Sequence, residues 1–403
     1  MDSHMMTGNL AAAWGARLAD VDYIPAFPIT PQTEIVEALA AWCERGELAA
    51  RFVSMDSEHS MMTAAGAAEV TGARVFTATS SQGLLHAFEV LYSISGWRAP
   101  LVLVNVSRAL AAPITLESDH NDVLAARDSG FLQIHAETCQ EVLDSILIAY
   151  RIAEDERVML PVIVNLDGFT LSFTREPVSL PDVETVRRFL PPFRPSHLGF
   201  AASSPHALGV AVIGGTPYAY FRHQMHLAAQ NALEVHREAA ESFYALFGRR
   251  YDLVEGYRLE DAEDVLVMTN AGASKGKAAV DVARAQGKRV GLLRLRVIRP
   301  WPAEAIRQAL RGRRGVAQPA VARSRVASRR SLRLLPPARG RVPAARGGPP
   351  AGHPGAGALA ALPGARRGHQ PGQRAVVGEA RVVLAGPPRG ERAAHHRHQR
   401  VDQ

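Results

Sequence analysis

Short apolar segments that alternate with helical segments constrain the fold of residues 1–175 more than any other feature of the chain. "APLVLVNVSR" (99–108) is an unbroken apolar run of the kind found in strands that are buried on both faces. A second apolar strand, 75–79, precedes residues 84–92, whose apolar side chains recur at helical spacing. Strands that alternate with helices predict an α/β fold with a doubly wound, mainly parallel sheet.

A second, smaller α/β domain is expected later in the chain. Residues 176–255 begin with a proline-rich stretch and continue as a long amphipathic helix that ends at Gly248, which predicts a connection. Residues 256–312 alternate strand and helix again, but the pattern stops after a few elements. The sequence therefore predicts only a partial domain at 256–312.

The composition changes abruptly after residue 312. Residues 313–403 contain 18 Arg and no Lys, Phe, Tyr or Trp, and their net charge of +15 leaves −8 on the first 312 residues, out of +7 for the chain. A basic nucleic-acid-binding arm, a disordered low-complexity tail and a shifted reading frame through GC-rich DNA remain open. We favour the frame shift because the break interrupts an unfinished α/β pattern. The absence of Lys and of stacking aromatics argues against nucleic-acid binding.

The remaining composition indicates a globular intracellular chain. The apolar fraction is 47%, and no apolar run is long enough to span a bilayer. Asp2 stands where a signal peptide would carry basic residues. The two cysteines, Cys43 and Cys139, fit a reducing compartment and are too few to bind an iron–sulfur cluster within this chain alone. We therefore expect a cytoplasmic protein without a membrane partner.

Two prolines bracket an Ile-Thr pair in "FPITPQTE" (27–34). Proline cannot donate to a sheet ladder and restricts the residue before it, so the preceding strand is expected to stop near Phe27. Pro28 and Pro31 then hold Thr30 in an extended turn. A hydroxyl group fixed at the tip of a strand is a candidate ligand-binding group.

Like Thr30, three further candidate groups follow the ends of predicted strands, where ligands of doubly wound sheets bind. Glu58 is either an exposed acid favoured by a helix dipole or a partly buried carboxylate tuned for acid–base work. Arg108 either grips a carboxylate or phosphate or forms a surface ion pair. Ser81, Gln82 and Gly83 either present backbone N–H groups to an anion or cap a helix.

Three other polar segments are weaker candidates. "ESDHND" (117–122) places Asp119, His120 and Asp122 side by side, but neighbours in sequence do not converge on one metal ion. "NLDGF" (165–169) lacks the first glycine and the following asparagine of a Gly-Asp-Gly magnesium–diphosphate motif. "NAGASKGK" (270–277) lacks the spacing of a P-loop, so a tight strand-to-helix turn is expected there.

The order of several motifs resembles the α subunit of the pyruvate:ferredoxin oxidoreductase family, which acts on 2-oxoacids. The resemblance covers residues 6 to about 312. It rests on "TGNLAAAWGA", "FPITPQTE", "DSEHS", "TATSSQG", "NVSRA", "SDHNDVLAARDSGF", "FGRRYDLVEGY" and "GLLRLRVIRPWPAEAIRQAL". Leu10 and Phe27 depart from the residues usual in the family, and the family's C-terminal ending is absent.

The resemblance implies a thiamine diphosphate pyrimidine-type domain at 1–175 and a partial transketolase C-terminal-like domain at 256–312. It implies that Glu58 hydrogen-bonds the aminopyrimidine ring and so promotes loss of the thiazolium proton, after which the cofactor acts as an electron sink for decarboxylation. Ser81, Gln82 and Gly83 would also contact the cofactor. Thr30 and Arg108 would bind the 2-oxoacid.

The resemblance also implies a multi-subunit enzyme. A β subunit would carry the diphosphate and Mg²⁺ site, and γ and ferredoxin-like subunits or other partners would carry [4Fe-4S] clusters, with coenzyme A as acyl acceptor and ferredoxin or another electron acceptor. Alternatives are a subunit of a non-oxidative thiamine-dependent decarboxylase and a nonproductive structural chain.

Overall fold

The main sheet of the first domain is parallel apart from one edge strand. The computed structural model describes residues 3–194, 203, 205, 207–209 and 211–317. The strand order is β12-β6-β7-β5-β4, and β12 is antiparallel to its neighbour. These strands are β4 (Phe76–Thr79), β5 (Val102–Ser107), β6 (Leu132–His135), β7 (Val162–Asp167) and β12 (Val297–Arg299). A parallel pair, β2 (Tyr23–Ala26) and β3 (Arg51–Ser54), continues the sheet through a bridge from Tyr23 to Val75.

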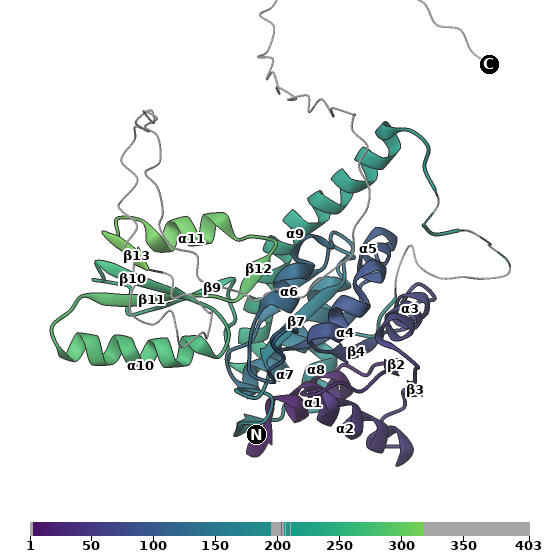
Figure 1. Ribbon diagram of the computed structural model, residues 1–403, viewed down its shortest axis with the longest axis horizontal. Helices are drawn as coiled ribbons and strands as arrows, with labels where there is room; N and C mark the ends of the chain where they lie inside the picture. Colours follow the sequence, from purple (N-terminus) through teal and green to yellow (C-terminus); the bar gives the residue numbers. More distant parts are fainter. Residues whose placement is uncertain (1–2, 195–202, 204, 206, 210, 318–403) are drawn as a thin grey trace, which may run out of the picture. The chain divides into compact units, whose positions relative to one another are not determined.

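Helices cover both faces of this sheet (Figure 1). One face packs against α1 (Gly8–Leu18), α2 (Thr33–Glu44), α7 (Cys139–Ala153), α8 (Val183–Phe189) and α9 (Gly215–Phe247). The other face packs against α3 (Glu58–Glu69), α4 (Ser81–His86), α5 (Phe88–Trp97) and α6 (Asn121–Ala125), which a 3₁₀ turn (Ala126–Asp128) follows. Val102 and Val104 of β5 point into the first core, whereas Leu103 points into the second. The predicted doubly wound sheet is confirmed, and both faces of β5 are apolar because both are covered.

Two features of this domain differ from the sequence prediction. An antiparallel pair, β1 (Ser3–Thr7) and β8 (Arg175–Ser179), was not predicted, because strands so short and so distant in sequence leave no periodic signal. The apolar stripe at 84–92 does not lie on one helix, since Ala87 separates α4 from α5. Leu85 and Tyr92 are consequently 38% and 39% exposed rather than buried.

The second domain is a four-stranded sheet with the order β13-β10-β11-β9. Its strands are β9 (Val254–Tyr257), which is antiparallel to its neighbour, β10 (Asp264–Met268), β11 (Val290–Leu295) and β13 (Gly315–Ala317). Helices α10 (Gly272–Ala285) and α11 (Ala303–Leu310) lie on opposite faces (Figure 1). The sheet includes β13, which lies just beyond residue 312. Residues 318–403, and with them most of the predicted aberrant tail, lie outside the described residues.

Buried ion pairs join the second domain to the first. Glu141 at the start of α7 accepts hydrogen bonds from Arg294 (2.7 Å) and Arg296 (2.6 Å) at the end of β11. Its side chain is 4% exposed, and the side chains of the two arginines are 0% and 4% exposed. Lys277 of α10 adds an ion pair with Glu137, 2.9 Å long. Paired charges of this kind hold two elements in one register, because neither partner is stable alone when buried.

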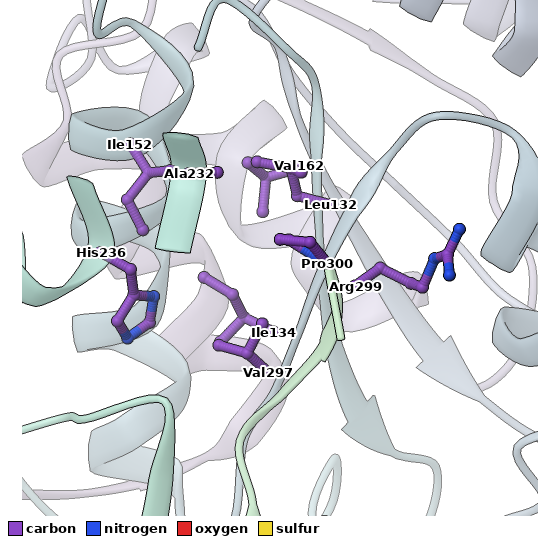
Figure 2. A pocket seen from close by; sticks show the side chains of 9 residues that line it. All are labelled: Leu132, Ile134, Ile152, Val162, Ala232, His236, Val297, Arg299 and Pro300. Carbon is purple, nitrogen blue, oxygen red and sulfur yellow. The ribbon is translucent and has the colours of Figure 1, made fainter. Parts of the chain in front are cut away.

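A small pocket lies at the edge of the first sheet that β12 forms, and residues of β12 line part of it. Figure 2 shows its lining, in which Arg299 extends away from the apolar side chains. The lining comprises Leu132, Ile134, Ile152, Val162, Ala232, His236, Val297, Arg299 and Pro300. His236 Nε2 donates to the carbonyl of Tyr251 at 2.8 Å, which leaves the pocket almost without polar groups to orient a ligand. None of the helices in the described part of the chain combines the length and apolarity needed to cross a bilayer.

Candidate active site at the carboxyl edge of the sheet

Thr30 lies in an exposed turn that is held by a side chain of the turn itself and by one from α1. Gln32 Nε2 donates to the carbonyl of Phe27 at 2.9 Å, and Asn9 Nδ2, fully buried on α1, donates to the carbonyl of Pro31 at 2.7 Å. Strand β2 ends at Ala26, as the prolines predict. The position of the Thr30 turn is therefore fixed by hydrogen bonds as well as by the two prolines.

Glu58 is the first residue of α3 and is buried. The Ser57 hydroxyl caps this helix and accepts a hydrogen bond from the N–H of Ser60 at 3.2 Å. Glu58 is only 7% exposed, and its Oε2 accepts a hydrogen bond from His86 Nδ1 at 3.0 Å. The helix dipole favours a carboxylate here. Glu58 is therefore a buried carboxylate and not an exposed acid.

Gly83 of α4 packs directly against the Glu58 carboxylate. A Cβ atom at Gly83 would lie 2.7 Å from Glu58 Oε1 and 2.5 Å from Thr79 Oγ1, so no other residue fits without displacing them. The Thr79 hydroxyl is fully buried and has no hydrogen-bond partner among the described residues. An unpaired buried hydroxyl beside a buried carboxylate is costly in a closed site, and a bound polar ligand would satisfy it. These groups fit the polar edge of an aminopyrimidine ring.

Ser81 and Gln82 precede Gly83 on α4, and Gln82 contacts Arg108. Ser81 adopts φ +48°, and its N–H donates to Asp122 Oδ2 at 3.0 Å, which offsets an unfavourable backbone conformation. Gln82 Oε1 accepts a hydrogen bond from the Arg108 guanidinium at 3.1 Å. Arg108 is 7% exposed, and its Nε has no hydrogen-bond partner in the described part of the chain. Burial lowers the pKa of this guanidinium, and the nearby Asp122 carboxylate opposes that shift.

Asp122 is the buried anchor of this segment, a role that the sequence did not reveal. Besides Ser81 it accepts hydrogen bonds from Ser107 Oγ (2.9 Å), Asn105 Nδ2 (3.1 Å) and the N–H of Val123 (2.7 Å). Burial raises the pKa of its carboxyl group, and these hydrogen bonds oppose the rise. Asp122 therefore fixes the start of α4 and the end of β5 relative to each other.

The candidate residues lie along one edge of the sheet, but not all are in contact. Contacts connect Glu58 to Gly83 and Gln82 to Arg108. No hydrogen bond within the described residues joins Thr30 to the others. Its neighbour Pro31 packs against Gly168, where a Cβ atom would lie 3.0 Å from the proline ring and 2.6 Å from the carbonyl of Ser107. The Thr30 turn thus adjoins the end of β5, from which Arg108 projects.

The segments 117–122 and 165–169 form structural hydrogen bonds. His120 Nε2 lies 2.6 Å from Asp167 Oδ1, and Asp167 Oδ2 accepts from the N–H of Ala271, which joins the two domains. Burial lowers the pKa of His120, but the hydrogen bond and charge of Asp167 outweigh it and raise the pKa overall. Asp119 accepts a hydrogen bond from the N–H of Asn121. Within the described ranges, no group of three or more His, Cys, Asp or Glu residues is placed to hold a metal ion.

The glycine-rich segment 270–277 is a strand-to-helix turn, as predicted. Asn270 Oδ1 lies 2.6 Å from His135 Nδ1, and Ser274 Oγ donates to Glu137 at 2.7 Å. Because His135 and Glu137 belong to the first domain, this turn contributes to the contact between the two domains.

Sequence reasoning also missed His86, which contacts the candidate catalytic carboxylate. The only signal was its spacing, since His86 follows Gln82 by four residues and a helix places such residues on one face. That spacing becomes informative only when α3 is known to pack beside α4.

Comparisons with known proteins agree with this geometry. The family model of the thiamine diphosphate-binding domain of pyruvate flavodoxin/ferredoxin oxidoreductase matches residues 14–241. The model of core domain II of pyruvate:ferredoxin oxidoreductase matches residues 262–328. The first match covers more than half of the chain.

Relatives of known function match over most of their length. Pyruvate synthase subunit PorA of Methanocaldococcus jannaschii is 46% identical over 317 residues, which are 78% of this chain and 81% of the relative. PorA of Thermotoga maritima is 40% identical over 77% of this chain and 78% of the relative. Ketoisovalerate oxidoreductase subunit VorA of Pyrococcus horikoshii is 38% identical over 78% of this chain and 79% of the relative. Because these relatives are oxidoreductase subunits, they do not favour the non-oxidative alternative.

A solved structure shares the fold. The 2-oxoglutarate:ferredoxin oxidoreductase of Magnetococcus marinus, determined with 2-oxoglutarate, coenzyme A and succinyl-CoA bound, superposes with a TM-score of 0.65 at 19% identity. The match covers 79% of this chain and 57% of that chain. The resemblance inferred from the sequence motifs is confirmed, and the chain belongs to the pyruvate flavodoxin/ferredoxin oxidoreductase family.

Proposed function

We propose that this chain is the α subunit of a multi-subunit enzyme that oxidatively decarboxylates a 2-oxoacid to an acyl-CoA. Electrons would pass through iron–sulfur clusters of partner subunits to ferredoxin or another acceptor, in the cytoplasm. One observation carries the proposal: the buried Glu58 carboxylate packs on Gly83 beside the unpaired hydroxyl of Thr79. The family membership and the oxidoreductase relatives support it.

Glu58 would act on the cofactor through a hydrogen bond. Thiamine diphosphate, when bound, supplies the electron sink for decarboxylation. Glu58 would hold a proton between its carboxylate and the aminopyrimidine ring, in a site where burial strengthens such a bond. The ring edge would also give the Thr79 hydroxyl the partner it lacks. Gly83 would let the ring and the carboxylate approach each other, with Ser81 and Gln82 beside them.

Arg108 and Thr30 would bind the substrate. Among the described residues, the Arg108 Nε has no hydrogen-bond partner, whereas a terminal nitrogen is held by Gln82, so the guanidinium is oriented and keeps one buried, unsatisfied donor. A substrate carboxylate would accept from this guanidinium, and the buried setting makes the charge-assisted bond strong. The exposed Thr30 hydroxyl, fixed on its braced turn, would donate to the oxo group.

The other half of the active site would come from partner chains. Cys43 is half-buried and Cys139 is buried, and they are the only two cysteines of the sequence. Burial raises the pKa of Cys139 above its usual range, which disfavours the thiolate that a cluster needs. A β subunit would supply the diphosphate and Mg²⁺ site, and partners would carry the clusters and meet coenzyme A.

Replacing Glu58 tests the cofactor role. In a reconstituted complex, we expect Glu58→Gln to reduce oxoacid oxidation by about 10²- to 10⁴-fold, because the amide cannot transfer the proton. Assembly, measured by gel filtration, should be unchanged. Glu89→Gln, an exposed change on α5, is the matched control and should retain full activity. Wild-type turnover by Glu58→Gln would remove Glu58 from the mechanism.

Replacing Arg108 tests the substrate role. Arg108→Ala should raise KM for the oxoacid by about 10- to 100-fold, the value of a charge-assisted hydrogen bond, with a smaller effect on KM for coenzyme A. Arg127→Ala, an exposed arginine after α6, should change neither value. An equal rise in both KM values for Arg108→Ala would contradict a carboxylate-binding role.

A further inference from the structure

His86 connects the buried Glu58 carboxylate to solvent. Its Nδ1 lies 3.0 Å from Glu58 Oε2, so the Nδ1–H donates to the carboxylate. The His86 side chain is 56% exposed, whereas that of Glu58 is 9% exposed. One nitrogen of the imidazole therefore contacts the Glu58 carboxylate, and the rest of the ring is accessible to water. An imidazole ring can accept a proton at one nitrogen and donate one from the other, which suits it to such a position.

The other oxygen of Glu58 faces a different group. Oε1 is the atom that approaches Gly83, on the side of the Thr79 hydroxyl. The two carboxylate oxygens therefore face different groups: Oε1 faces Gly83 and Thr79, where the cofactor is proposed to bind, and Oε2 faces His86. A hydrogen bond at Oε2 restricts rotation of the carboxylate and so orients Oε1.

Other ionisable side chains lie on the elements around α4. On α3, the His59 ring lies 6.4 Å from the His86 ring, centroid to centroid. On α6, Asp122 accepts from Ser81 and three other donors, and at the end of β5 Arg108 bonds Gln82. On α5, Glu89 follows His86 by three residues and is exposed. Among these groups, only Glu58 is hydrogen-bonded to the His86 ring.

We propose that His86 is a positioning residue for Glu58 and exchanges protons between that carboxylate and solvent. In the exchange, a hydronium ion gives a proton to Nε2 of the neutral His86 ring while the Nδ1 proton passes to Glu58 Oε2, leaving water, a neutral imidazole protonated at Nε2 and a neutral carboxyl group. The reverse transfer returns the proton. This inference rests on the proposed role of Glu58 toward the thiamine cofactor.

NMR of the full-length chain at one pH tests the contact without any activity. The Nδ1–H signal of His86, assigned by its loss in His86→Ala, should lie downfield in the wild type and move upfield in Glu58→Gln, because a charged carboxylate is a stronger hydrogen-bond acceptor than an amide. The ring signals of His59, followed in the same spectra, serve as the control and should move much less. A His86 Nδ1–H signal at the same position in the two proteins would overturn the proposal.

Activity of the assembled complex tests the consequence. We expect His86→Ala to lower kcat about tenfold with little change in KM, and to shift the pH dependence of kcat. His86→Asn keeps an N–H donor near the position of Nδ1, so it should restore part of kcat but not the wild-type pH profile. His59→Ala is the control and should match the wild type. A His86→Ala enzyme with wild-type kcat and pH profile would overturn the proposal.

The two proposals fail separately. If Glu58→Gln is inactive and both His86 variants resemble the wild type, His86 has no role although Glu58 does. If Glu58→Gln is fully active, the proposed function itself fails.

Discussion

A single glycine determines whether the Glu58 carboxylate can occupy its position. We expect Gly83→Ala to reduce activity of the assembled complex at least tenfold, because the new Cβ would overlap Glu58 Oε1 and Thr79 Oγ1. Alanine is the better helix former by about 0.5–1 kcal/mol, whereas overpacking costs about 1–3 kcal/mol, so the net loss of stability should lie between about 0 and 2.5 kcal/mol. Measuring both activity and urea denaturation of Gly83→Ala separates the loss of activity from the loss of stability.

Gly96 provides the matched control for this substitution. It lies on α5, and a Cβ atom there would meet no atom within 4 Å. Gly96→Ala should therefore retain activity and gain up to about 1 kcal/mol of stability. Equal activity of the Gly83→Ala and Gly96→Ala enzymes would contradict the packing of Glu58 on Gly83.

At the scale of elements, α7 and β11 depend on each other through Glu141. Burial alone would raise the pKa of Glu141, but Arg294 and Arg296 outweigh it and lower the pKa to about 2. Glu141→Gln would remove one carboxylate from two buried guanidinium groups that Glu255 still contacts, which should cost about 1.5–3 kcal/mol in unfolding free energy. Urea denaturation of the full-length chain measures this loss.

An exposed ion pair provides the comparison for Glu141. Glu184 bonds Arg187 on α8, with side-chain exposures of 79% and 59%. Glu184→Gln should cost less than about 1 kcal/mol, because water screens the pair. Similar losses in the two variants would mean that the Glu141 cluster does not hold the domains together.

The sequence predicted elements whose signals are local. The apolar run of β5, the end of α9 at Gly248 and the strand end before Pro28 all follow from composition and turn chemistry, and the structure confirms them. The β1–β8 pair and the entry of β12 into the first sheet were not predictable, because each joins segments far apart in sequence.

The residues of the candidate site likewise fall into those that the sequence could locate and those that it could not. The positions of Glu58 and Arg108 at strand ends follow from the alternation of strands and helices, and their location is as expected. The roles of His86 and Asp122 depend on which helix packs beside which, and periodicity carries no such information. Asp122 even stood in a motif that superficially resembles a metal site.

At the scale of the whole molecule, buried neutral histidines predict acid sensitivity. Burial lowers the pKa of His236 to about 4 and that of His135 to about 3. Both values lie below the unfolded value of about 6.5, so the unfolded chain binds more protons and stability falls as pH drops below 6.5. His120, whose pKa is raised, acts in the opposite sense, and Glu141 adds a further loss only as pH falls from about 4.5 toward 2.

His236→Gln isolates one of these titrations. Glutamine keeps an N–H donor for the Tyr251 carbonyl but does not titrate, so the loss of stability between pH 7 and pH 5 should shrink by about 2 kcal/mol. His223→Gln, on the exposed part of α9, should leave the pH dependence unchanged. Urea denaturation at the two pH values measures both, and an unchanged slope in His236→Gln would show that this histidine is not buried neutral.

The central claim is that a carboxylate of this chain completes a thiamine site whose diphosphate half belongs to a partner. The most direct measurement is an experimental structure of the assembled complex with thiamine diphosphate bound. We predict a Glu58 carboxylate oxygen within about 3 Å of a ring nitrogen of the aminopyrimidine. A cofactor whose aminopyrimidine lies out of hydrogen-bond reach of Glu58 would contradict the account.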